Sequence, residues 1–183
     1  KEYRFIFHNN NFFNYRNNSF NFFRILFYKI MIKIIGGKYK GRKLLQIPKT
    51  NTRPTQAVVR KSMFDILGTL DGLNVLDLYS GVGTLGIESI SRGAQSLVSV
   101  EKDKFTYKVL KDNLDMICTS DSILTYNMDV MQFLKLNDRK FDLVIADPPY
   151  KIDIYDYLKE VAESTLNPRG ILCVEMKKKE MKN

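Results

Sequence analysis

Residues 74–86 read NVLDLYSGVGTLG, and this stretch decides the fold. An apolar run ends in a glycine-rich turn, and a helical pattern starts directly after it. Glycines let the backbone of such a turn approach a ligand closely. The stretch therefore predicts a buried strand over Asn74–Leu78, a ligand-binding turn, and a helix over Gly83–Ser91.

The same alternation of strand and helix continues toward the C-terminus. We expect strands at Leu97–Val100, Ile123–Tyr126, Leu143–Ala146 and Ile171–Val174, and helices at Lys104–Met116, Val130–Leu134 and Ile154–Ser164. Units of these lengths are typical of an α/β fold, a mostly parallel Rossmann-like sheet with helices on both faces. Upstream, residues 32–35 and 42–45 predict a β-hairpin around Gly36-Gly37, and Thr55–Leu67 predicts a helix that Thr55 caps.

The charge of the chain is concentrated near its N-terminal end. Residues 31–64 hold nine lysines and arginines and no acid, whereas residues 65–183 carry a net charge of −4. A basic module joined to a mildly acidic body favours a polyanionic partner. We therefore divide the chain into a basic hairpin and helix at 31–70 and a ligand-binding domain at 71–183.

Residues 1–30 have an unusual composition, with eight of the twelve phenylalanines and many asparagines. Arg24, Lys29 and Lys33 interrupt the apolar stretch, which excludes a membrane span or a signal peptide. The first methionine is Met31. We expect this segment to be a low-complexity, non-native or disordered extension without a function.

The glycine turn predicts a nucleotide-like cofactor. Gly81 and Gly83 stand at the end of the first strand, and Glu101 ends the second strand, 20 residues after Gly81. A carboxylate at that place can accept hydrogen bonds from both hydroxyls of a ribose. Asp129, after the third strand, can accept one from an adenine amino group.

The choice of cofactor lies between NAD and S-adenosylmethionine. Asp77 and Ser80 place polar groups before the glycines, where a charged amino-acid moiety, not a pyrophosphate, needs partners. The only histidine is His8, so we see no acid for hydride transfer in the domain. These two points favour S-adenosylmethionine. A turn whose glycines serve only the backbone is the alternative.

A second motif, Asp147-Pro148-Pro149-Tyr150, follows the apolar run that ends at Ala146. Asp147 and the carbonyl of Pro148 can accept the hydrogens of an exocyclic amino group and direct its lone pair at a methyl donor. Tyr150 offers a face on which a base can stack. The motif therefore indicates methyl transfer to a base nitrogen. A strand exit stiffened by the prolines, with Asp147 as an N-cap, is the alternative.

The cysteines argue against other chemistries. Cys118 and Cys173 have neither metal-ligand spacing nor a disulfide framework, so we expect no metal site. Methyl transfer to C5 of a pyrimidine needs a nucleophilic cysteine in the pocket. Neither cysteine stands beside a proline at a strand end, and this reaction is rejected.

The chain resembles the bacterial 16S ribosomal RNA guanine-N2 methyltransferases of the RsmD type. The resemblance rests on residues 34–37 (IIGG), 41–44 (GRKL), 53–55 (RPT), 59–60 (VR) with Phe64, 76–83 (LDLYSGVG) and 147–150 (DPPY), and it runs from about Met31 to Glu175. It implies a class I S-adenosylmethionine-dependent methyltransferase fold and, as substrate, 16S rRNA or the small ribosomal subunit. We expect a cytoplasmic monomer without a membrane or metal partner.

The resemblance also implies roles for individual residues. The cofactor site would consist of Asp77, Ser80, Gly81, Gly83, Glu101 and Asp129. The target guanine would be held by Asp147, Pro148, Pro149 and Tyr150. Arg42, Arg53 and Arg60 would contact RNA or shape its pocket. Independently of the resemblance, the acid-free segment 31–64 predicts that Lys38, Lys40, Arg42 and Lys43 contact the RNA.

The chain departs from the family pattern after the fifth strand. The fold normally continues with a helix and a closing hairpin, whereas only a lysine-rich tail remains here. We therefore expect a C-terminally truncated domain in which Ile171–Val174 is an exposed edge strand. Two other functions stay open: a DNA adenine-N6 or cytosine-N4 methyltransferase, for whose target-recognition region the chain has little room, and an inactive RNA-binding remnant.

Overall fold

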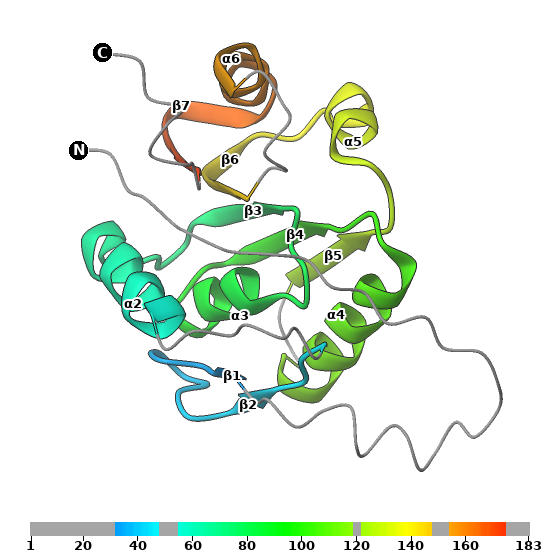
Figure 1. Ribbon diagram of the computed structural model, residues 1–183. Helices are drawn as coiled ribbons and strands as arrows, with labels where there is room; N and C mark the ends of the chain where they lie inside the picture. The colour runs from blue at the N-terminus through cyan, green and yellow to red at the C-terminus, as the bar shows by residue number, and fades with distance from the viewer. Residues whose placement is uncertain (1–31, 48–54, 119–121, 148–153, 175–183) are drawn as a thin grey trace, which may run out of the picture.

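A five-stranded parallel sheet forms the centre of the protein (Figure 1). The computed structural model describes residues 32–47, 55–118, 122–147 and 154–174. The strand order is β5-β4-β3-β6-β7, and every neighbouring pair is parallel. The strands are β3 (Asn74–Leu78), β4 (Ser96–Val100), β5 (Ser122–Tyr126), β6 (Phe141–Ala146) and β7 (Leu166–Val174). The predicted α/β fold is confirmed.

Helices cover both faces of this sheet because its strands are apolar on both sides. One buried cluster joins Val75 and Leu143 to α2, α3 and α4, and the other joins Leu76 and Val144 to α5 and α6. The helices are α2 (Thr55–Leu67), α3 (Thr84–Ser91), α4 (Lys104–Ile117), α5 (Val130–Leu136) and α6 (Ile154–Thr165). Among the described residues, none of the helices is both long and apolar enough to span a membrane.

The predicted hairpin is present as a separate two-stranded sheet. Its strands, β1 (Ile32–Lys33) and β2 (Lys43–Leu44), are antiparallel, and Ile34 and Leu44 are buried in the cluster that contains α3 and α4. Gly37 has a φ of +74°, and a Cβ atom there would lie 1.7 Å from the carbonyl oxygen of Ser91. Only glycine therefore permits this approach of the hairpin to α3.

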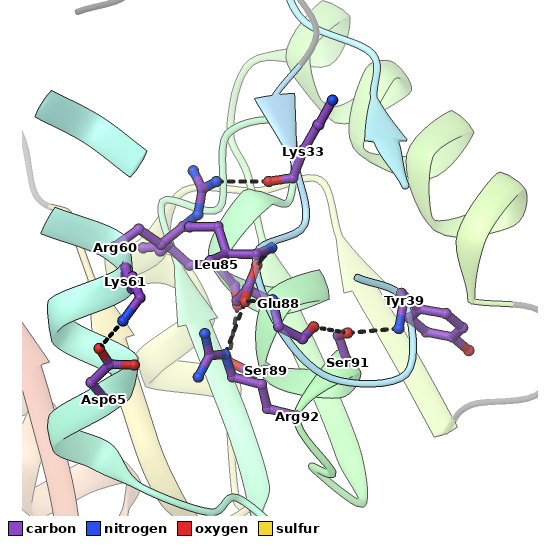
Figure 2. A network of polar contacts seen from close by, with 12 residues as sticks. Lys33, Tyr39, Arg60, Lys61, Asp65, Leu85, Glu88, Ser89, Ser91 and Arg92 are labelled. Atoms are coloured by element: carbon purple, nitrogen blue, oxygen red, sulfur yellow. Dashed lines mark hydrogen bonds and ion pairs between the residues drawn. The ribbon is translucent and has the colours of Figure 1, made fainter. Parts of the chain in front are cut away.

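A buried carboxylate holds the hairpin on α3 (Figure 2). The side chain of Glu88 is fully buried, and its two oxygens accept hydrogen bonds from the backbone N–H groups of Ile35 and Gly36, each at 2.8 Å. The guanidinium of Arg92 donates to the same carboxylate at 2.9 Å. A buried charge is tolerated only when it is paired in this way. Glu88 thus joins three partners into one contact between hairpin and domain.

The last strand differs from the prediction. We expected it to begin at Ile171, but β7 begins at Leu166, which pairs with Phe141. The register then shifts, so that Ile171 pairs with Leu143, and Arg169 adopts a left-handed φ of 71° within the irregularity. Such a bulge depends on a pairing with a distant strand, which local patterns do not reveal. Within the described part of the chain, β7 is an edge strand, and Ile171 is 48% exposed.

We predict that Glu88→Gln lowers the free energy of unfolding by about 2–4 kcal/mol, because one amide hydrogen would face a backbone N–H and the charge that pairs with Arg92 would be lost. Urea denaturation measures this loss. Asp65→Asn is the matched control. It removes an ion pair of the same spacing, Lys61–Asp65, that is exposed on α2, and we expect it to cost less than about 1 kcal/mol. Equal losses in the two variants would contradict the role given to Glu88.

Candidate functional site

The carboxyl ends of three adjacent strands bring acidic residues to one edge of the sheet. Leu78 of β3 pairs with Val100 of β4 on one side and with Ala146 of β6 on the other. Glu101 and Asp147 directly follow these two partners, and they therefore lie on either side of the end of β3. Ligands of open α/β sheets bind at this edge.

The turn after β3 is closed by hydrogen bonds from one serine. The hydroxyl of Ser80 donates to the carbonyl oxygen of Asp77 at 2.6 Å, and its backbone N–H donates to the carbonyl oxygen of Val100 at 3.0 Å. Ser80 is buried and holds the turn against β4. The structure therefore gives the serine, which we expected to bind the cofactor, a role in shaping the turn.

The two glycines of the turn serve different purposes. Gly81 has a φ of +58°, and a Cβ atom there would meet nothing within 4 Å. Gly83 has a φ of +86°, and its Cβ would lie 2.5 Å from the side chain of Leu110 on α4. Gly81 therefore leaves open space in front of the turn, whereas Gly83 allows the turn to pack closely on α4.

Asp77 is a buried carboxylate at the start of α3. Its Oδ2 accepts a hydrogen bond from the backbone N–H of Gly86 at 3.0 Å. Gly83 occupies the N-cap position and makes no side-chain cap, so Asp77 supplies the missing negative group from the strand. The pKa of the Asp77 carboxyl is raised to about 7, mainly by burial and also by the negative charges of Glu101 and Asp147, which together outweigh the lowering by the hydrogen bond from Gly86. A positively charged partner would therefore stabilise the ionised form of Asp77.

Glu101 connects the turn to the end of β4. Its Oε2 accepts from the backbone N–H of Gly81 at 2.9 Å, and its Oε1 accepts from the N–H of Asp103 at 2.7 Å. Each carboxylate oxygen has two acceptor sites, so one remains on each for a ligand hydroxyl. The half-buried carboxylate lies beside the open space in front of Gly81.

Asp129 lies at the end of β5, where it caps α5. Its Oδ1 accepts from the N–H of Met131 at 2.9 Å, and its Oδ2 pairs with the ammonium of Lys102 at 2.9 Å. The hydrogen bond from Lys102 holds the pKa of the Asp129 carboxyl below its usual value. Asn127 donates to the carbonyl oxygens of Glu101 and Lys102 and fixes the two strand ends together.

The basic residues of the hairpin are divided between surface and interior. Five of them are exposed, namely Lys33, Lys38, Lys40, Arg42 and Lys43, and the last four are the ones predicted to contact RNA. Arg60, in contrast, is buried on α2, where it donates to the carbonyl oxygen of Lys33 at 2.8 Å and burial lowers the pKa of its guanidinium. Its burial argues against a direct RNA contact and fits a role in shaping the hairpin.

The target motif is described only in part. Asp147 is exposed at the end of β6 and close enough to Asp77 to act on its charge, whereas Pro148, Pro149 and Tyr150 lie outside the described residues, as does Arg53. Among the residues that the structure describes, no group of three or more His, Cys, Asp or Glu side chains is arranged to hold a metal ion.

Two residues at this edge were missed by the sequence analysis. Tyr79 has a left-handed φ of 59°, and its ring lies 6.2 Å from that of Tyr157 on α6. A left-handed tyrosine is strained, and such strain clusters at functional sites. The other residue is Asn113, a fully buried amide on α4. The strained backbone of Tyr79 leaves no local signal in the sequence, whereas a lone asparagine among the apolar positions of a helix is a weak one.

Two curated proteins that resemble this chain are named as methyltransferases. A family model described as "Conserved hypothetical protein 95" matches residues 32–183. The chain is 34% identical over 143 residues to "Putative rRNA methyltransferase YlbH" of Bacillus subtilis, an alignment that covers 70% of this chain and 78% of that protein. It is 31% identical over 153 residues to "Ribosomal RNA small subunit methyltransferase D" of Haemophilus influenzae, with 80% and 79% covered.

Solved structures agree. The chain superimposes on a putative methyltransferase from Escherichia coli with a TM-score of 0.68 at 28% identity, covering 79% of this chain and 81% of that one. A putative methylase from Haemophilus influenzae gives 0.63 at 29% identity, with 79% and 80% covered. The predicted class I methyltransferase fold is therefore confirmed. The match over residues 32–183 and the two relatives above 30% identity show that the chain belongs to the family of the ribosomal RNA small subunit methyltransferases D.

Proposed function

We propose that this protein uses S-adenosylmethionine to methylate the exocyclic N2 amino group of a guanine in 16S ribosomal RNA. The single observation that carries the proposal is the convergence of Asp77, Glu101 and Asp147 at the carboxyl edge of the sheet, around a glycine turn that is open in front of Gly81. The names of the relatives support ribosomal RNA as the substrate.

The residues of the turn fit S-adenosylmethionine. Burial and the negative charges of Glu101 and Asp147 raise the pKa of Asp77, so a ligand with a positive charge would stabilise its ionised form. Glu101 keeps acceptor capacity for ribose hydroxyls beside the open space at Gly81. Asp129 keeps lone pairs for an adenine amino group beyond its bonds to α5 and Lys102. The cofactor supplies a methyl group on a sulfonium, which needs no metal or redox chemistry.

The protein then has to prepare a poor nucleophile. The lone pair of an exocyclic amino group is delocalised into the guanine ring. Asp147 accepts a hydrogen bond from this group, which localises the lone pair, and its charge stabilises the positive charge that develops on the nitrogen. The methylated nitrogen then releases one proton, to Asp147 or to water. The carbonyl oxygen of Pro148 would accept the second amino hydrogen, and the ring of Tyr150 would stack on the base. The catalytic contribution is therefore positioning and electrostatics.

The RNA is held outside the pocket by the hairpin. Lys38, Lys40 and Lys43 are exposed, and Arg42 is exposed as well, although its Nη1 donates to the carbonyl oxygen of Ile117 on α4. These cations attract phosphates without reading sequence. A DNA amino methyltransferase shares the target motif, but the ribosomal RNA relatives favour RNA.

We predict that S-adenosylmethionine binds about tenfold more tightly at pH 7 than at pH 5.5. The pKa of Asp77 in the folded protein, about 7, lies above the ordinary aspartate value of 3.8, so the free energy of unfolding falls as the pH rises from about 4 to 7. A positively charged ligand stabilises the ionised form, and its binding must release the proton at lower pH. Titration calorimetry in buffers of different ionisation enthalpy measures affinity and proton release together.

Asp77→Asn should remove both the pH dependence and the proton release. Asp142→Asn is the matched control, because Asp142 also accepts a backbone N–H, that of Asn74 at 2.9 Å, and this bond lowers the pKa of its carboxyl. The control should keep the wild-type profile. A wild-type affinity that is flat between pH 5.5 and 7 would remove Asp77 from the binding of the cofactor.

We predict that Asp147→Ala loses at least ~10²-fold in turnover while its affinity for S-adenosylmethionine changes little, because this carboxylate acts on the base and not on the cofactor. Transfer of a labelled methyl group to small-subunit RNA measures turnover. Asp138→Ala, an exposed aspartate just before β6 at the opposite edge of the sheet, should be fully active. A fully active Asp147→Ala protein would overturn the mechanism.

We predict that changing Lys38, Lys40 and Lys43 together to glutamine weakens RNA binding and flattens its dependence on salt, since fewer counterions are released. The logarithm of affinity is measured against the logarithm of salt concentration. The control changes three lysines on the other side of the sheet, Lys135, Lys140 and Lys159. An unchanged slope in the hairpin variant would show that the hairpin does not hold the RNA.

A further inference from the structure

One buried side chain connects the hairpin to the glycine turn. Asn113 of α4 is fully buried, and its Oδ1 accepts a hydrogen bond from the backbone N–H of Leu45 at 2.7 Å. Its Nδ2 donates to the carbonyl oxygens of Leu45, at 3.1 Å, and of Val82, at 2.8 Å. Both amide hydrogens are therefore used, one on each segment.

The two segments that meet at Asn113 have different functions in the proposed enzyme. Leu45 directly follows β2, in which Lys43 is an exposed cation of the hairpin. Val82 stands between the two glycines of the cofactor turn, and the preceding residue, Gly81, donates its N–H to Glu101. A shift of the hairpin therefore moves a hydrogen-bond partner of the turn.

The hairpin has a second contact with the same helix. Arg42 donates from Nη1 to the carbonyl oxygen of Ile117, one turn beyond Asn113 on α4. The end of the hairpin is thus fixed to α4 at two points. Of these two contacts, the one at Asn113 also reaches the glycine turn, and an unpaired carbonyl or amide would be costly at this buried place. The amide consequently fixes the hairpin and the turn in one arrangement.

We propose that Asn113 is a positioning residue that couples the RNA-binding hairpin to the cofactor-binding turn. This inference rests on the proposed function. RNA bound to the hairpin then raises the affinity for the cofactor at the turn. By linkage, the cofactor raises the affinity for RNA by the same factor. The enzyme binds its cofactor more tightly when it holds RNA, although the two ligands contact different segments.

A matched control exists on the neighbouring helix. Ser91 of α3 also holds the hairpin, since its hydroxyl donates to the carbonyl oxygen of Gly36 and accepts from the N–H of Tyr39 at 2.9 Å (Figure 2). It is buried like Asn113, but its hydrogen bonds do not include the glycine turn. Ser91→Ala therefore loosens the hairpin without touching the link between hairpin and turn.

The first test uses S-adenosylhomocysteine alone and amide hydrogen exchange of the full chain. The reporters are the N–H groups of Ile34 and Gly41, which are bonded within the hairpin. In the wild type and in Ser91→Ala, the ligand should slow their exchange at least fivefold. In Asn113→Asp, which cannot donate to Val82, and in Asn113→Ala, it should bind without slowing them.

The second test measures the coupling itself. Saturating S-adenosylhomocysteine should raise the affinity of the wild type for small-subunit RNA at least fivefold. Ser91→Ala should bind RNA more weakly but keep this factor, whereas Asn113→Asp should reduce it to about one. A merely structural role for Asn113 would make the two variants behave alike.

Three results would overturn the inference. They are wild-type binding of the ligand without any change in hairpin exchange, Asn113 variants that keep the wild-type response, and a coupling factor that falls equally in Ser91→Ala. If the Asn113 variants do not fold, a wild type in which the ligand binds without slowing hairpin exchange still overturns the inference. A wild-type protein that does not bind S-adenosylhomocysteine would contradict the proposed function and, with it, the inference.

Discussion

The hydrogen bond from the N–H of Gly86 to the buried carboxylate of Asp77 is the contact on which the rest of the site depends. It ties β3 to the first turn of α3 and supplies the negative group that the glycine at the N-cap cannot provide. Because the turn between them is anchored at both ends, Gly81 can remain open toward a ligand. Asp77 therefore has two roles. It caps α3 in the fold, and it is the buried carboxylate that a positively charged ligand would stabilise.

The hairpin extends this arrangement outward. Glu88 receives two of its backbone N–H groups, and Asn113 receives a third while it holds the carbonyl of Val82. Polar groups buried in this way are strong constraints, since losing one partner leaves the other unpaired. The hairpin that carries the exposed basic residues is therefore attached to the domain by buried hydrogen bonds. Its position relative to the turn is set by side chains of α3 and α4.

Much of this architecture could be predicted from the sequence, because alternating apolar runs and turns leave few ways to build the sheet. The strand over Asn74–Leu78 and the helix over Thr55–Leu67 were predicted with their observed bounds. The early start of β7 was not, because it depends on pairing with Phe141 across a bulge. Arg60 was expected to contact the RNA or to shape its pocket, and its buried side chain donates to the carbonyl oxygen of Lys33, 27 residues away. Contacts of this range decide which polar groups are buried, and patterns of neighbouring residues do not contain them.

The central claim concerns the atom that receives the methyl group. It is tested by incubating the protein with labelled S-adenosylmethionine and unmodified small-subunit RNA, free or in assembled subunits, and by identifying the labelled nucleoside by mass spectrometry. The account predicts one product, N2-methylguanosine, because Asp147 at the end of β6 serves an amino group and not a ring carbon. Label in a ring-carbon product such as 5-methylcytidine, or in another amino product such as N6-methyladenosine, would contradict it.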